Sequence, residues 1–262
     1  MTFFTLSDIG KVRTNNEDYA ESFAYKLCNP DGSFSETVVM LLCDGMGGGP
    51  AGERASYLAV ETMKTCIIQD ILTRTQETSN SEYLELFDKY IQKSHFNIYK
   101  EGIEDQKLYG MGTTIVAGMI LKDNLLLTHV GDSRAYCYGA NGLRQLTKDH
   151  SLVQQYVDEG KITQEEAFYH PQKNIITRVL GAGSGAPVKV DNKYVPLANN
   201  DIVLFCTDGL CGVLEEPEII EIFSRYYNDN TDLKALANHL IQAACLKGGP
   251  DNVTVSLYQH KI

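Results

Sequence analysis

Residues 38–45 read VVMLLCDG, and residues 202–209 read IVLFCTDG. Each is an apolar run of the length of a buried strand, and each ends in an Asp-Gly pair. Asp-Gly alone is a common turn, as in the polar segment around Asp31-Gly32, to which we assign no chemistry. Asp44 and Asp208 differ, because a rigid strand end can hold a carboxylate where a metal ion requires it.

Apolar runs elsewhere in the chain predict further strands, at residues 113–121, 125–130, 133–138, 189–197 and 253–258. A polar turn at residues 122–124 joins two of these runs, so we expect an antiparallel pair that continues as a meander through Tyr138. Residue spacings of three and four predict helices after Ala51 and at residues 81–100, 152–159, 217–227 and 233–246. Polar segments at 73–80 and 181–187 are expected to be loops. Strands and helices that occur in blocks favour a layered α+β fold over a doubly wound parallel sheet.

The composition limits the possible partners and compartments. The chain has 262 residues, 43% of them hydrophobic, and we treat residues 1–262 as a single domain. Its formal net charge of −11 disfavours a nucleic-acid partner, because phosphate binding requires a basic face. The apolar runs are too short to span a membrane, and residues 1–10 do not resemble a signal peptide, so we expect a cytoplasmic protein. Its 7 cysteines lack CxxC spacing, which argues against a disulfide framework or a zinc site.

Two further aspartates resemble Asp44 and Asp208 in position. Asp132 lies between two predicted strands, and Asp251 precedes the last one. If these strand ends meet at one edge, the four carboxylates repel one another and must either take up protons or bind a cation. Oxygen ligands without a histidine or cysteine cluster select magnesium or manganese, and Gly45 can expose a backbone carbonyl to the same ion.

Near the amino terminus, residues 13–18 read RTNNED, which places an arginine shortly before two acids. The planar fork of Arg13 suits two phosphate oxygens. Taken alone, this stretch is more typical of an exposed, charged loop.

Eight short motifs follow one another along nearly the whole chain, at residues 13–18, 44–48, 52–56, 112–114, 130–134, 177–181, 207–210 and 249–254. Each motif is weak alone, but in this order they resemble the metal-dependent serine/threonine protein phosphatases of the type 2C family, in their compact bacterial form. The resemblance implies a four-layer α-β-β-α sandwich of two antiparallel sheets flanked by helices. It also implies hydrolysis of phosphoserine and phosphothreonine in proteins by a metal-activated water, without a phosphoenzyme. The expected partners are phosphorylated proteins, targets of a bacterial serine/threonine kinase.

The resemblance also assigns metal ligands, for two Mn²⁺ or Mg²⁺ ions per chain and a third, weaker site. Asp44 resembles the ligand that bridges the first two metals, and the carbonyl of Gly45 resembles a ligand of one of them. Asp208 and Asp251 resemble ligands of the other metal. Asp132, with Asp208, resembles the ligands of the third metal. Asp44, Asp208 and Asp251 are therefore expected to be essential for catalysis.

The remaining assignments concern residues that hold water, a residue that binds phosphate, and a flap. Glu17 and Asp18 resemble the acids that hold water in the metal shell, and Arg13 resembles the catalytic arginine that binds phosphate. Residues 145–176 resemble the variable flap beside the active site.

One departure from the family pattern concerns the general acid. The compact bacterial motif ends in histidine, whereas this chain has Gly49 followed by Pro50. Met46 stands where eukaryotic relatives carry their histidine, which leaves His150 and His170 as candidates, although a lone loop histidine is more often structural. The alternative hypotheses are a pseudophosphatase that acts as a regulatory binding module, and an interaction domain without metal, which leaves the clustered aspartates unexplained.

Overall fold

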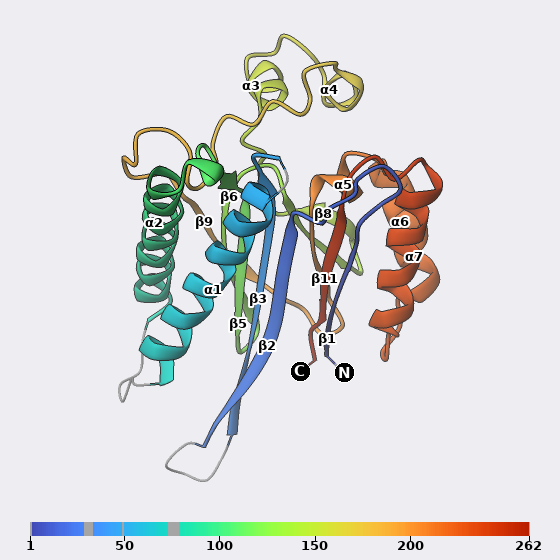
Figure 1. Cartoon of the computed structure of the whole chain (residues 1–262). Coiled ribbons are helices and arrows are strands. Elements are labelled where there is room, and N and C mark those ends of the chain that lie inside the picture. The colour runs from blue at the N-terminus through green and yellow to red at the C-terminus, as the bar shows by residue number, and fades with distance from the viewer. Residues whose placement is uncertain (1, 29–33, 49, 73–78, 262) are drawn as a thin grey trace.

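The computed structural model describes residues 2–28, 34–48, 50–72 and 79–261, and it contains two antiparallel sheets that face each other (Figure 1). The first sheet has the order β1-β11-β10-β7-β8. Its strands are β1 (Phe3–Asp8), β7 (Arg134–Gly139), β8 (Gly142–Gln145), β10 (Ile202–Cys206) and β11 (Val253–Gln259). The second sheet has the order β2-β3-β5-β6-β9, and a short strand pairs with the end of β3. Its strands are β2 (Asp18–Cys28), β3 (Phe34–Met46), β4 (Gly112–Thr113), β5 (Ile115–Leu121), β6 (Asn124–Val130) and β9 (Asp191–Pro196).

Helices cover the outer face of each sheet, which confirms the predicted four-layer α+β sandwich (Figure 1). The second sheet is covered by α1 (Pro50–Leu72) and α2 (Asn80–Glu104), followed by a 3₁₀ turn, η1 (Gln106–Leu108). The first sheet is covered by α5 (Asp208–Cys211), α6 (Glu216–Tyr226) and α7 (Leu233–Leu246). Two short helices, α3 (Leu152–Asp158) and α4 (Gln164–Tyr169), lie above the upper ends of the sheets in Figure 1. Among the described residues, no helix is both long and apolar enough to cross a membrane.

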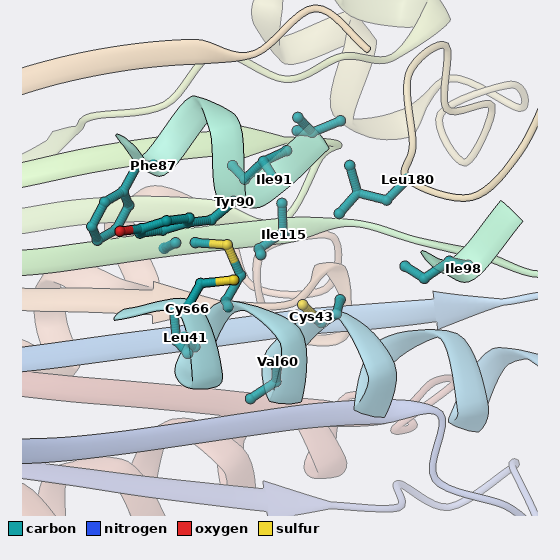
Figure 2. Close-up of a cluster of buried hydrophobic side chains, with 14 of the residues drawn as sticks. Leu41, Cys43, Val60, Cys66, Phe87, Tyr90, Ile91, Ile98, Ile115 and Leu180 are labelled. Atoms are coloured by element: carbon teal, nitrogen blue, oxygen red, sulfur yellow. The ribbon is translucent and has the colours of Figure 1, made fainter. Parts of the chain in front are cut away.

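Three hydrophobic clusters hold these layers together, and β3 contributes to two of them. Val39, Leu41 and Cys43 pack against α1 and α2, in the cluster of which Figure 2 shows a part. Their neighbours Met40 and Leu42 point the other way, into the cluster between the sheets. Because side chains alternate along a strand, one uninterrupted apolar run fills both clusters. The third cluster lies between the first sheet and helices α5 to α7.

The predicted strands and helices are confirmed at their positions, but the predicted meander is wrong. β5 and β6 pair around Lys122, as expected. After Val130 the chain leaves that sheet, and β7 pairs with β10 and β8 in the other sheet. The crossing occurs at Gly131, whose φ of 118° favours glycine, and where an added Cβ lies 2.5 Å from the Cβ of Thr114. The tight approach of the chain to Thr114 therefore redirects β7 across the sandwich.

The loop predictions are only partly covered by the described residues. Residues 181–187 contain no helix or strand, as predicted. The Asp31-Gly32 turn and most of the loop at 73–80 lie outside the described residues, and α2 begins at Asn80. Strands β1 and β2 were not predicted, because polar residues interrupt their apolar ones, which form no run longer than three residues.

Candidate metal centre

The carboxylates singled out in the sequence lie where strands begin or end at one edge of the sandwich. Asp18 begins β2 and lies directly opposite Asp44 of β3 in the antiparallel ladder. Asp208 follows β10 and Asp251 precedes β11, and these two strands are also antiparallel neighbours. The end of one antiparallel strand lies beside the start of the next, so each pair shares an edge. The hydroxyl of Thr207, at the end of β10, donates to Asp18 Oδ2 at 2.9 Å and joins the two edges.

The carboxylates of this edge lie close enough to shift one another's pKa values. Burial raises the pKa of Asp44 well above its usual range, and the charges of Asp18, Asp208, Asp132 and Asp251 raise it further. Burial likewise raises the pKa of Asp18 to about 7, although two hydroxyl donors oppose the shift. The pKa of Asp208 is raised by burial and by Asp251. Without a bound cation, these carboxylates cannot all stay ionised at neutral pH.

Asp132 reaches the same group of charges from the turn between β6 and β7. Its side chain is only 6% exposed, and its Oδ1 atom has no hydrogen-bond partner among the described residues. Burial raises the pKa of Asp132 well above its usual range, as do the charges of Asp208 and Asp149. A buried carboxylate oxygen without a donor is rare in folded proteins, and a cation would satisfy it. The donor set therefore fits hard divalent cations such as Mg²⁺ or Mn²⁺.

Three threonines fix the geometry of this edge, and the sequence reasoning did not assign them a role. Thr254 donates to Asp18 Oδ2 at 2.6 Å, in addition to the bond from Thr207. The backbone N–H of Asp44 donates to Thr114 Oγ1 at 3.0 Å. These threonines lie in the same sequence motifs as the aspartates, so the motifs could have pointed to them. Their hydrogen bonds join segments that are distant in sequence, and the motifs do not predict such bonds.

Gly45 and Gly52 lie so close to Glu17 and to each other that neither position has room for a side chain. The N–H of Gly45 donates to the carbonyl of Glu17 at 3.0 Å, and a Cβ on Gly45 would lie 2.1 Å from the carbonyl oxygen of Gly52. A Cβ on Gly52 would lie 2.2 Å from Glu17 Oε2. Asn252 holds the same loop, because its Oδ1 accepts from the Glu17 N–H at 2.8 Å. The backbone of Glu17 is therefore held by Gly45 and by the Asn252 side chain, and its carboxylate lies close to Gly52.

Arg13 lies at the rim of this edge. Its Nη2 atom is 2.8 Å from Asp251 Oδ2, and its side chain is 49% exposed. The hydrogen bond and the charge of Asp251 raise the pKa of the guanidinium, so it stays charged. The arginine is thus both solvent-exposed and in contact with the carboxylate group.

Each of the two candidate histidines is engaged by other contacts, and only His150 has both ring nitrogens occupied. His150 Nδ1 accepts from the Gly131 N–H at 3.0 Å, and its Nε2 lies 2.7 Å from Arg178 Nη1. Burial, His129 and Arg178 lower the pKa of His150 to about 4, so the ring is neutral at physiological pH and is a poor general acid. His170 Nδ1 accepts from a local backbone N–H at 3.1 Å. Gly49 lies outside the described residues.

A second group of metal-ligand type consists of His129, His150 and Asp191, with one ligand atom of each lying within 4.8 Å of the others. The guanidinium of Arg178 already contacts two of them, donating to Asp191 Oδ1 at 3.1 Å. Because a charged side chain occupies this place, we interpret the group as a structural ion pair.

Comparisons with known proteins find a matching family, similar sequences and similar solved structures. Residues 26–242 match the family described as Protein phosphatase 2C. The chain is 35% identical over 257 residues to the "Serine/threonine phosphatase stp" of Listeria welshimeri, covering 98% of this chain and 94% of that protein. It is 34% identical to the solved serine/threonine phosphatase of S. agalactiae, with a TM-score of 0.81 over 98% of this chain and 99% of that one.

A further solved structure carries metal. It is the catalytic domain of the serine/threonine protein phosphatase PstP in complex with 2 manganese ions. It is 32% identical to this chain, with a TM-score of 0.79 over 99% of this chain and 98% of that one. The match to the family covers most of the sequence, and the relatives are aligned along almost their whole length. This chain belongs to the protein phosphatase 2C family.

Proposed function

We propose that residues 1–262 act as one catalytic domain that hydrolyses phosphoserine and phosphothreonine in proteins, with two Mn²⁺ or Mg²⁺ ions at the edge described above. The observation that carries the proposal is the buried carboxylate group, in which Asp44 faces four other aspartates and Asp132 Oδ1 has no donor among the described residues. Such a group is costly unless it binds cations. Each carboxylate expected from the family resemblance is present in the sequence.

In this proposal Asp44 would be shared by the two metals, the carbonyl of Gly45 would serve one of them, and Asp208 and Asp251 would hold the other. Support comes from the electrostatic coupling of Asp44 to both Asp208 and Asp251. A third, weaker site would use Asp132 with Asp208, whose charge is the strongest electrostatic influence on Asp132. Both Mn²⁺ and Mg²⁺ accept these oxygen ligands.

When bound, the metal pair lowers the pKa of a water molecule towards neutrality and neutralises charge on the phosphoryl oxygens. The protein's own residues hold and orient the reactants. Glu17 and Asp18 accept hydrogen bonds from water, and Thr207 and Thr254 hold the Asp18 carboxylate in place. The guanidinium of Arg13 has further donors for two phosphoryl oxygens.

The proposed substrates are cytoplasmic phosphoproteins, including targets of a serine/threonine kinase. Residues 145–176, which contain α3 and α4, are proposed to form the flap beside the site. The pseudophosphatase alternative gains no support, since none of the expected ligands is replaced.

The test is phosphate release from a phosphothreonine peptide by the purified chain in the presence of Mn²⁺. Asp44→Asn is the informative variant, because it removes the charge at the centre of the group while keeping the size of the side chain. Hydrolysis by the wild type and its loss in Asp44→Asn are expected. A wild-type protein that binds Mn²⁺ but releases no phosphate would instead establish the pseudophosphatase alternative.

A further inference from the structure

A pocket of about 310 Å³ opens beside the metal edge, between the α3–α4 segment and the α5–α6 region. Asp132 and Asp208 form part of its lining, so the pocket adjoins the proposed catalytic site. In Figure 1, α4 lies above α5 and α6, and segments far apart in sequence therefore form the two sides. Its volume is at the lower end of the range for ligand pockets, roughly 300–1,000 Å³, which suits one or two side chains.

Two contacts hold the sides of this pocket in place. Lys173 Nζ, from the α3–α4 segment, donates to the Gly212 carbonyl at 2.9 Å, and it also lies 5.0 Å from the centre of the Phe168 ring. The hydroxyl of Tyr169 donates to Glu215 Oε1 at 2.6 Å. Both contacts join the segment around α4 to the region between α5 and α6. The pocket is therefore a built feature of the fold, with walls fixed from both sides.

The walls combine apolar surface with acidic groups. The apolar part is formed by side chains from α3, α4, the loop before α6 and the first turn of α6, namely Val153, Ala167, Phe168, Leu214 and Pro217. Glu165 in the first turn of α4 and Glu216 in the first turn of α6 add two exposed carboxylates. Within the part of the chain that the structure describes, neither glutamate forms an ion pair.

The two cations of the lining do not neutralise these carboxylates. Arg134 is almost fully engaged by Asp149, with three N–H···O contacts of 2.8 to 3.1 Å. Lys173 is directed to the Gly212 carbonyl. Even if bound metals neutralise Asp132 and Asp208, the charge of Glu165 and Glu216 remains. The pocket thus has apolar walls and two carboxylates whose negative charge is not paired with a cation of the lining.

We propose that this pocket receives a lysine or arginine side chain that lies near the phosphorylated residue of the protein substrate. The inference rests on the proposed function and specifies its substrate class. Lysine and arginine carry an apolar stem below a charged head, and this combination matches apolar walls with carboxylates beside them. An acidic side chain would meet like charges, and a purely apolar one would leave the carboxylates without a partner.

The experiment compares phosphothreonine peptides that differ at one flanking position, scanned through the sequence on both sides of the phosphothreonine. At each position the residue is lysine, norleucine or glutamate, so lysine and norleucine share the apolar stem and differ in charge. We expect kcat/KM of the Mn²⁺-loaded enzyme to be about 2- to 30-fold higher for lysine than for norleucine at one position, the range given by two solvent-exposed charge pairs. Both peptides are compared on the same protein sample. A smaller fraction of folded enzyme therefore lowers both kcat/KM values equally and leaves their ratio unchanged.

Variants connect this preference to the pocket. Glu165→Gln with Glu216→Gln should bring the ratio of lysine to norleucine peptides close to one, and Glu165→Lys with Glu216→Lys should favour the glutamate peptide. The matched control is Glu85→Gln, an exposed glutamate on α2, on the opposite side of the sandwich in Figure 1, which should keep the wild-type ratio.

Two results would overturn the inference: equal kcat/KM for all peptides in the wild type, or a lysine preference that persists in the double glutamine variant. Failure of the proposed function is distinguishable from both. In that case, no peptide is hydrolysed by any of the proteins at saturating Mn²⁺.

Discussion

Removal of metal should make the stability of this protein depend on pH in an unusual direction. In the metal-free fold, burial raises the pKa of Asp18 from 3.8 to about 7. Between these two values the folded protein binds a proton that the unfolded chain has already released. The contribution of Asp18 to folding is therefore most favourable at low pH, and it becomes unfavourable as the pH rises from 4 towards 7. Most buried carboxylates that are paired with cations show the opposite dependence.

The size of the effect follows from the two pKa values of Asp18. At about 1.36 kcal/mol per pKa unit, the difference between 3.8 and about 7 corresponds to roughly 4 kcal/mol lost by neutral pH. At about 2–4 °C per kcal/mol for a chain of this size, the melting temperature falls by roughly 10 °C. Asp44, Asp132 and Asp208, whose pKa values are also raised, act in the same direction.

The assay is thermal unfolding of chelator-treated protein across this pH range, repeated with added Mn²⁺. We expect Mn²⁺ to stabilise the protein far more at neutral pH than at pH 5, because only ionised carboxylates bind the metal well. Asp18→Asn is the control, because its amide oxygen can still accept from Thr207 and Thr254, and it should weaken the pH dependence of the metal-free protein. A metal-free protein whose melting temperature rises steadily towards neutral pH would refute this reasoning.

The remaining predictions concern kinetics. Asp208→Asn should reduce kcat at least about 100-fold, and Asp132→Asn less, because Asp208 is assigned to two metals and Asp132 to the outer one; the reverse order would show that these assignments are wrong. Arg13→Ala should raise KM more than it lowers kcat, as initial rates on p-nitrophenyl phosphate would show; unchanged kinetics would make Arg13 a solvent-exposed loop residue only. Gly49→His should increase turnover of phosphothreonine peptides more than that of p-nitrophenyl phosphate, because only the alkoxide leaving group needs protonation, a contribution of about 10²–10⁴-fold. Equal gains on both substrates would argue against a missing general acid.

The layered α+β fold could be predicted because strands and helices occur in blocks along the chain, and the family resemblance implied its four layers. The central strands could be recognised because they are apolar on both faces. β3 and β10 are buried on both sides, so each forms one continuous apolar run that ends in Asp-Gly. The partner of β7 could not be predicted in the same way. Residues 134–139 fit either sheet by their pattern, and the close approach of Gly131 to Thr114 decides between them. That approach depends on residues distant in sequence, which periodicity does not report.

For the candidate site too, the residues could be predicted from the sequence, whereas the contacts between distant segments could not. Asp44, Asp132, Asp208 and Asp251 are visible in the sequence, because each adjoins a strand. The hydrogen bonds that orient them are not visible, because they join segments far apart, as in the bond from Thr254 to Asp18. The pocket beside Asp132 is also formed by distant helices. Its charge and shape could be recognised only after folding had brought α4 and α6 together.

The most direct test of the central claim is a titration of chelator-treated protein with Mn²⁺ and, separately, with Mg²⁺. Metal binding is followed by calorimetry, and phosphate release from a phosphothreonine peptide is measured in the same samples. The account predicts no hydrolysis in excess chelator, and activity that appears as two metal ions bind per chain. Full activity in excess chelator would contradict it, because the carboxylates at the strand edge supply no nucleophile of their own.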